Sequence, residues 1–143
     1  MGWVKDRFDE QAAYATEVPR LWNRMSESIG VSLREFNEGT KGTSNTLGKT
    51  DCRAKGDYCI RILKAIDNSS IEVYLDESSQ SLNASRGGHT AAGRICSYRI
   101  TEDRKCAEFF VQDADGRARA ISVDDACKMA IGEFIFPATP TKQ

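Results

Sequence analysis

The sequence has few of the residues from which metal and thiol active sites are usually built. Its 143 residues include one histidine and five cysteines, and no two cysteines have CxxC spacing. Zinc sites and redox motifs use that spacing, and a catalytic thiol needs a base beside it. The single histidine, His89, lies in a glycine-rich stretch. We therefore expect no metal, no cofactor and no catalytic residue, and we interpret the cysteines as small apolar residues.

Long apolar runs and a large net charge are also lacking. No stretch approaches the roughly 18 to 20 apolar residues of a membrane span. The formal net charge of −1 gives no strong basic field to attract nucleic acid or a membrane surface. The first residues, MGWVKDRFDE, carry charges throughout, unlike a signal peptide. We expect a soluble, intracellular and cytoplasmic protein with no membrane partner.

Residues 42–51, GTSNTLGKTD, fail the spacing test for a phosphate-binding loop. That motif requires Gly, four residues and then Gly-Lys-Thr, whereas five residues separate Gly42 from Gly48. The run also lies between a helical pattern and a strand pattern, so no helix N-terminus is offered to an anion. We expect no nucleotide hydrolysis and interpret residues 39–57 as a linker that contains, at most, a short strand near residues 46–53.

An amphipathic pattern of helical period runs through residues 1–38. It predicts a long helix, although Pro19 lies inside it and is typical of a kink or of a break between two helices. The apolar stripe keeps its phase across Pro19, which favours one kinked helix. We expect its second half to pack in the core.

The first half of this helix has a separate interpretation. A helix of roughly 34 residues is about 50 Å long, whereas a domain of this size is less than roughly 40 Å across, so one end must overhang. The stripe also fits a heptad repeat of the kind that pairs helices. Val4, Phe8 and Ala15 are therefore candidate contacts for self-association.

Five segments with strand-like composition follow, and short turn sequences separate several of them, which indicates antiparallel neighbours. One turn, DADG at 113–116, predicts a tight hairpin at Asp115 and Gly116 and lacks the spacing of a calcium loop. The predicted strands cover residues 58–66, 70–76, 94–100, 107–113 and 117–123.

A second amphipathic pattern covers residues 123–136. Ser122 and Asp125 have capping-box spacing before it, and Pro137 ends it. We expect an α+β domain: a long N-terminal helix, an antiparallel sheet of about five strands, and a C-terminal helix, with both helices on one sheet face. The predicted division is one domain over 1–137, with its sheet over 58–123, and a disordered tail over 138–143.

Residues 78–93, SSQSLNASRGGHTAAG, show no clear period and predict a long loop, either functional or a mobile hairpin tip. Arg86 and His89 are candidate anion-binding residues there. Strand alternation places Arg61, Arg99 and Arg119 on the outer sheet face near aromatic side chains, as in sheets that bind single-stranded nucleic acid. Acidic residues on the same face oppose that interpretation.

Three function hypotheses follow. The first is a small non-catalytic interaction domain that acts through protein–protein contacts, including self-association as a homodimer. The second is a module that binds an anionic ligand or single-stranded nucleic acid on the outer sheet face, with residues 78–93 as a lid. The third is an enzyme with a cysteine nucleophile, for which Cys96 and Cys106 are the candidates.

Overall fold

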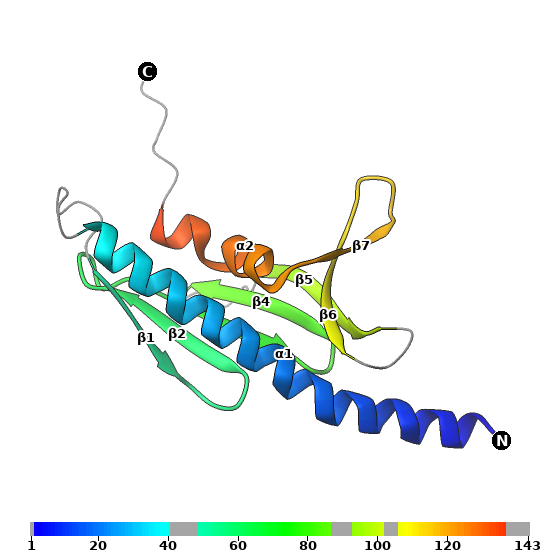
Figure 1. Ribbon diagram of the computed structural model, residues 1–143. Helices are drawn as coiled ribbons and strands as arrows, with labels where there is room; N and C mark the ends of the chain where they lie inside the picture. The colour runs from blue at the N-terminus through cyan, green and yellow to red at the C-terminus, as the bar shows by residue number, and fades with distance from the viewer. Residues whose placement is uncertain (1, 41–48, 87–92, 102–105, 137–143) are drawn as a thin grey trace.

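The fold is seen in a computed structural model that describes residues 2–40, 49–86, 93–101 and 106–136 (Figure 1). Two helices and seven strands make up these residues, which confirms the α+β class. In chain order the elements are α1 (Trp3–Thr40), β1 (Thr50–Ala54), β2 (Cys59–Lys64), β3 (Ser70–Asp76), β4 (Ser81–Arg86), β5 (Gly93–Ile100), β6 (Ala107–Gln112), β7 (Ala118–Ile121) and α2 (Val123–Ile135).

The strands form one antiparallel sheet in which the spatial order equals the chain order, from β1 to β7. Each strand therefore pairs with its sequence neighbours. All five predicted strands are present, as β2, β3, β5, β6 and β7. The sheet has seven strands rather than about five: β4 was not predicted, and β1 overlaps the short strand that the sequence allowed near residues 46–53.

Strand β4 lies inside the segment that was predicted to be a long loop, so that prediction is wrong for residues 81–86. Its sequence, SLNASR, has one large apolar residue, Leu82, and no β-branched residue, which leaves neither alternation nor strand propensity to detect. The strand forms because it pairs with β3 on one edge and β5 on the other. Strand β1 lies inside the segment interpreted as a linker, close to the short strand allowed there.

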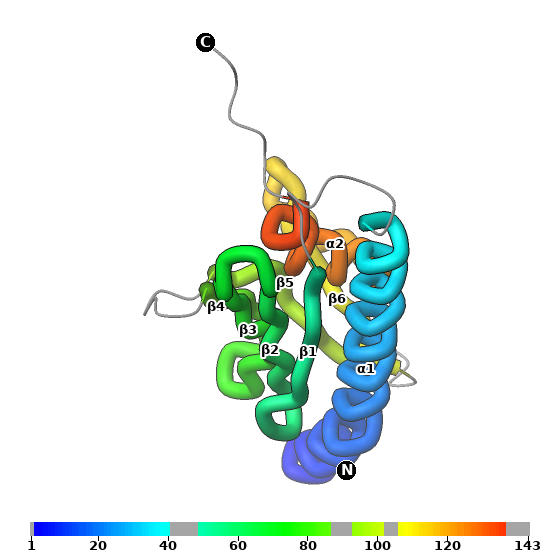
Figure 2. The backbone as a smooth tube through the Cα atoms, turned by 90° about the vertical axis from the view of Figure 1, so that its left-hand side faces the viewer, coloured from blue at the N-terminus to red at the C-terminus, as the bar shows by residue number. Residues whose placement is uncertain are grey.

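The core lies between the sheet and the helices. Every second residue of β2 and β3 is buried, as expected for a sheet with one covered face. Helices α1 and α2 contact each other, and each also contacts strands of the sheet; Figure 2 shows the two helices side by side. The large side chains with 0% exposure in this core are Leu21, Met25, Ile29, Ile62, Val73, Leu82 and Phe109.

Helix α1 is continuous across Pro19, so the alternative of two helices is wrong. With 38 residues the helix is about 57 Å long, and its first turns project beyond the sheet (Figure 1). Its buried residues begin at Glu17 and Val18 and continue to Phe36. The second half of the helix is thus part of the core, as predicted.

Helix α2 begins as the sequence predicted. The hydroxyl of Ser122 accepts a hydrogen bond from the backbone N–H of Asp125 at 3.0 Å, which satisfies one free amide of the first turn. None of the helices in the described ranges combines the length and apolar character that a membrane crossing requires.

Candidate functional site

The first candidate site is the projecting part of α1, residues 3–16, which we call the α1 extension. No side chain in it is buried. Three large apolar side chains are strongly exposed: Trp3 at 74%, Val4 at 48% and Phe8 at 64%. Ala15 is exposed as well. The three residues predicted to form the self-association surface, Val4, Phe8 and Ala15, therefore all face solvent in this chain.

Local ion pairs support the helical form of the extension without help from the sheet. Lys5 pairs with Asp9 at 3.0 Å, and Arg7 pairs with Glu10 at 4.0 Å. Pairs three or four residues apart stabilise a helix by only a few tenths of a kcal/mol each. They keep the polar side of the extension charged, while nothing in the described residues covers its apolar side chains.

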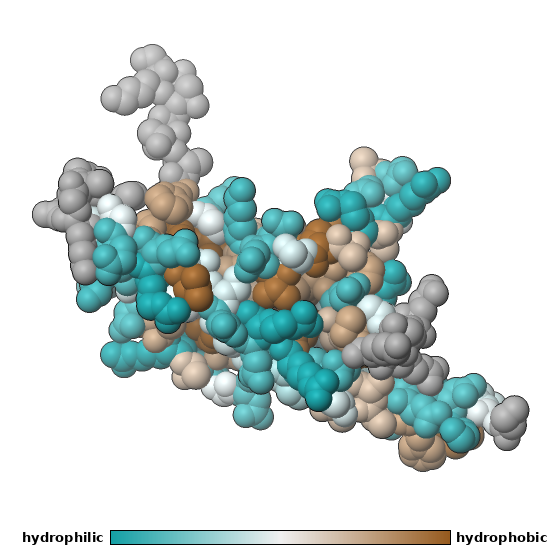
Figure 3. Space-filling view, viewed as in Figure 1, coloured by the Kyte–Doolittle hydropathy of each residue, from teal (hydrophilic) through white to brown (hydrophobic). Residues whose placement is uncertain are grey.

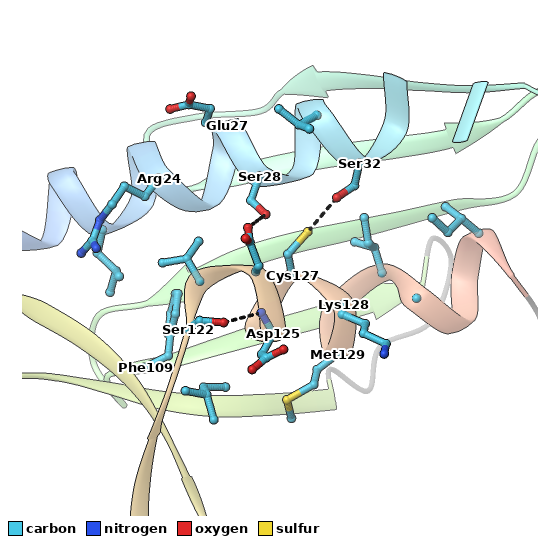
Figure 4. Close-up of a pocket in the computed structure, with 18 of the residues that line it drawn as sticks. Arg24, Glu27, Ser28, Ser32, Phe109, Ser122, Asp125, Cys127, Lys128 and Met129 are labelled. Atoms are coloured by element: carbon cyan, nitrogen blue, oxygen red, sulfur yellow. Dashed lines mark hydrogen bonds between the residues drawn. The ribbon is translucent and has the colours of Figure 1, made fainter. Parts of the chain in front are cut away.

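The second candidate site is an open groove of about 1750 Å³ between α1 and α2, which residues of β6 and β7 also line. We call it the α1–α2 groove. Apolar surface, brown in Figure 3, lies here among hydrophilic residues. Ser28 and Ser32 of α1 point toward α2 at the bottom of the groove (Figure 4): the Ser28 hydroxyl donates to Asp124 at 2.8 Å, and Ser32 contacts the Cys127 sulfur at 3.8 Å.

Three exposed apolar side chains line this groove: Val31 from α1 at 37%, Met129 from α2 at 47%, and Phe136 at 58%. Phe136 also packs edge-on against Phe36 with ring centroids 5.0 Å apart. The sequence interpretation missed the groove. Met129 was the available signal, because it is an apolar residue outside the apolar face assigned to α2.

The predicted binding arginines do not form one cluster. The guanidinium of Arg61 donates to Glu72 at 2.8 Å, and Lys55 donates to the same carboxylate at 2.9 Å. These hydrogen bonds from Lys55 and Arg61 lower the pKa of Glu72. The charge of Arg61 is therefore already paired within the sheet.

Arg99 and Arg119 lie on opposite faces of the sheet. Arg99 stacks over the ring of Phe110 at 4.0 Å from its centroid. Phe110 pairs with Ala120, so Arg119 falls on the other face, where it lines the α1–α2 groove and pairs with Asp113 at 3.3 Å. The prediction that both arginines share the outer face is wrong for Arg119. The register of the β6–β7 hairpin places the Arg119 side chain on the face of the sheet that the helices cover.

The two remaining candidates come from the segment around β4. Arg86 pairs in register with the buried Ile71, which places it on the core side of the sheet at the exposed end of β4. It is separated by the sheet from Arg61 and Arg99. The other candidate, His89, lies outside the described residues.

Two of the cysteines, Cys96 and Cys127, lack the setting of a nucleophile. Burial raises the pKa of Cys96 to about 12, and burial also raises the pKa of Cys127. Both thiols are protonated near neutral pH, whereas catalysis requires the thiolate. Cys106 contacts the Thr101 hydroxyl at 4.0 Å.

The described ranges contain no group of three or more His, Cys, Asp and Glu residues arranged to hold a metal ion. The two surfaces with the largest exposed apolar side chains are the α1 extension and the α1–α2 groove. Comparison of the chain with protein-family models, with curated proteins and with solved structures gave no significant match.

Proposed function

We propose that this protein is a non-catalytic interaction domain that forms a homodimer through the α1 extension. The observation that carries the proposal is the exposure of Val4 and Phe8, at 48% and 64%, on a helix that leaves the body of the molecule. Burying a side chain of this type contributes about 1.5 to 3 kcal/mol. A partner that covers both therefore gains substantially from the contact.

The helical structure of the α1 extension also supports binding to a partner. Residues 3–16 span about 21 Å and include no buried side chain. The Tyr14 hydroxyl, at the end of the extension, donates to Gln80 at 3.3 Å. Helices of this length are marginal alone in water, and packing of an apolar side is what usually stabilises them. A second helix along the stripe supplies that packing.

A second copy of the chain fits the charge order along the helix. The start of the helix carries two bases and one acid, Lys5, Asp6 and Arg7, and three acids follow, at Asp9, Glu10 and Glu17. Two antiparallel copies bring the weakly positive start of each helix beside the acidic residues of the other, which favours that orientation. The apolar stripe that continues into the core supplies the seam. We further infer that both helices cover the same face of the sheet, which leaves the extension free to pair.

The geometry supports nucleic-acid binding less well. Stacking of Arg99 on Phe110 is the kind of platform that bases use. Glu108 pairs in register with Arg99, however, and Glu72 neutralises Arg61. A phosphate backbone approaching this face meets acids beside each base, so the electrostatic attraction that drives such binding is weak.

The proposal is tested by replacing Val4 and Phe8 together with glutamate and measuring the molar mass by size exclusion with light scattering. We expect the natural chain to be dimeric at high micromolar concentration. The double variant is expected to be monomeric, because each interface would bury unpaired carboxylates.

A matched control places the same two charges four residues apart on the flank of the stripe, as Ala12→Glu with Thr16→Glu. Both positions are exposed in the same helix. The control variant should remain dimeric. A natural chain that is monomeric throughout, or equal dissociation of both variants, contradicts the proposal.

A further inference from the structure

The α1–α2 groove is larger and more open than a typical pocket for a small molecule. Its volume of about 1750 Å³ exceeds the roughly 300 to 1000 Å³ of typical ligand pockets. It runs beside α2, whose 13 residues span about 20 Å. A segment of polypeptide of similar length matches these dimensions.

The walls of the groove have the pattern that grooves for helices use. Val31 of α1 lies on one wall, Met129 of α2 lies on the other, and Phe136, directly after the end of α2, also lines the groove. Exposed methionine and phenylalanine are adaptable and strongly apolar contacts for an incoming side chain. An amphipathic helix inserts apolar residues between such walls at positions i, i+3 or i+4, and i+7.

The rim of the groove carries an excess of unpaired acids. They are Glu27 and Glu35 on α1, and Asp125 and Glu133 on α2. None of these four has an ion-pair partner among the residues that the structure describes.

The bases along the groove are fewer and mostly engaged. Arg24 donates to the carbonyl of Ala107 at 3.1 Å, and Arg119 pairs with Asp113 at 3.3 Å. Lys128 has no such partner in the described ranges. The rim is therefore negative overall, and it favours a cationic ligand over nucleic acid or an anionic membrane.

We propose that the α1–α2 groove binds a positively charged amphipathic helix of a partner protein. Its apolar residues contact Val31, Met129 and Phe136, and its lysine or arginine side chains face Glu35 and Glu133 across the rim. The α1 extension of a second copy is not this ligand, because its residues 3–16 carry three acids and two bases and so no positive net charge. The groove and the dimer contact are thus separate surfaces, and neither depends on the other.

The experiment uses the full chain and a labelled synthetic peptide of about 14 residues, the length that spans the groove. The peptide places leucine at i, i+3, i+4 and i+7 and lysine at the other positions. Binding is followed by fluorescence anisotropy, and the contact surface is mapped by amide chemical shifts in NMR. We expect saturable binding that weakens as salt is raised, with shift changes centred on Val31 and Met129.

Two comparisons separate this site from general charge attraction. A peptide with glutamate in place of lysine should bind at least about tenfold more weakly. The variant Glu35→Lys with Glu133→Lys should weaken binding of the lysine peptide by a similar factor. Asp57→Lys with Glu77→Lys makes the same change in net charge at exposed positions outside the groove, and it should bind as the natural chain does.

The outcomes are decisive in either direction when circular dichroism shows that both variants are folded. Loss of binding in the groove variant alone supports the proposal. Equal loss in both variants, equal binding of the two peptides, no saturable binding, or shift changes away from the groove overturns it. If the groove variant does not fold, Met129→Ser at the exposed wall replaces it, with the same expected loss of affinity.

Discussion

Gly116 adopts a φ of +86° in the turn between β6 and β7. Its N–H donates to the carbonyl of Asp113 at 2.9 Å, and the N–H of Asp113 donates to Arg117 at 2.8 Å. A side chain disfavours this left-handed conformation, which explains the glycine of the DADG run. The turn also sets the register of the hairpin, and thereby the face on which Arg119 lies.

Two glycines should respond oppositely to the same substitution. Gly116→Ala is expected to lower the free energy of unfolding by about 1 kcal/mol, because alanine is strained at positive φ. Gly30→Ala is expected to raise it by about 1 kcal/mol, because Gly30 lies inside α1 and an added Cβ comes no closer than 4.0 Å to the Arg34 side chain. Urea unfolding measures both free energies of unfolding. Changes of the same sign in the two variants would contradict this explanation of Gly116 in the turn.

The buried thiols give a second prediction at this scale. Cys96 is 4% exposed with a pKa of about 12, so it should resist alkylation by iodoacetamide at pH 8 in the folded protein. Cys127, 2% exposed and with its pKa also raised by burial, should resist as well. Both should react rapidly after unfolding, as followed by mass spectrometry of the peptides. Rapid labelling of folded Cys96 would contradict its assignment to the core and revive the thiol-enzyme hypothesis.

Structural roles that depend only on residues close in the chain were predictable from the sequence, and roles that depend on strand register were not. Ser122 caps α2 as predicted because a cap involves only residues a few positions apart. Arg119 was assigned to the wrong face because its side depends on how β7 aligns with β6. A shift of one residue in that alignment reverses the face of every side chain on the strand.

Among the elements, α1 and five strands were predictable because their periodicity is strong over several turns or residues. Strand β4 was not, since tertiary pairing rather than its own sequence makes it a strand. Ser81 and Asn83 within it are buried, at 1% and 8%, and the Asn83 amide donates to the Ser81 hydroxyl at 2.9 Å. Buried polar residues that form hydrogen bonds with each other in this way give a sequence pattern typical of a loop.

The side chain of Asn37 connects α1 to β1 through three hydrogen bonds. The amide group of Asn37 donates to the carbonyl of Thr50 at 2.9 Å. Its oxygen accepts from the Thr50 N–H at 2.9 Å and from the Thr50 hydroxyl at 3.1 Å. Thr50 is 1% exposed, so these backbone groups have little access to water. Asn37 therefore fixes the C-terminal part of the helix to the edge strand of the sheet.

Asn37→Ala should lower the free energy of unfolding by about 1 to 3 kcal/mol, because it leaves buried polar groups of Thr50 without partners. Asn23→Ala is the matched control, since Asn23 is an exposed asparagine of the same helix. It should change stability little, with a small gain from helix propensity. Guanidinium unfolding of both variants measures the difference, and equal effects would show that the Asn37 bonds contribute nothing.

For the whole molecule, the α1 extension was predictable from a comparison of helix length with domain size. The α1–α2 groove was not, because it depends on how two helices distant in sequence pack beside the β6–β7 hairpin. The extension carries exposed apolar side chains on a helix with charges of both signs, whereas the groove has an acidic rim. The two surfaces therefore suit different partners: a second copy for the extension, and a cationic helix for the groove.

Sedimentation equilibrium of the full chain tests the central claim, self-association through the α1 extension, most directly. We predict that the apparent mass rises with concentration from 15.9 kDa toward twice that value. In the variant with Val4→Glu and Phe8→Glu it should stay at the monomer mass. A natural chain that remains at 15.9 kDa at every concentration, or a dimer that the variant leaves intact, would contradict the claim.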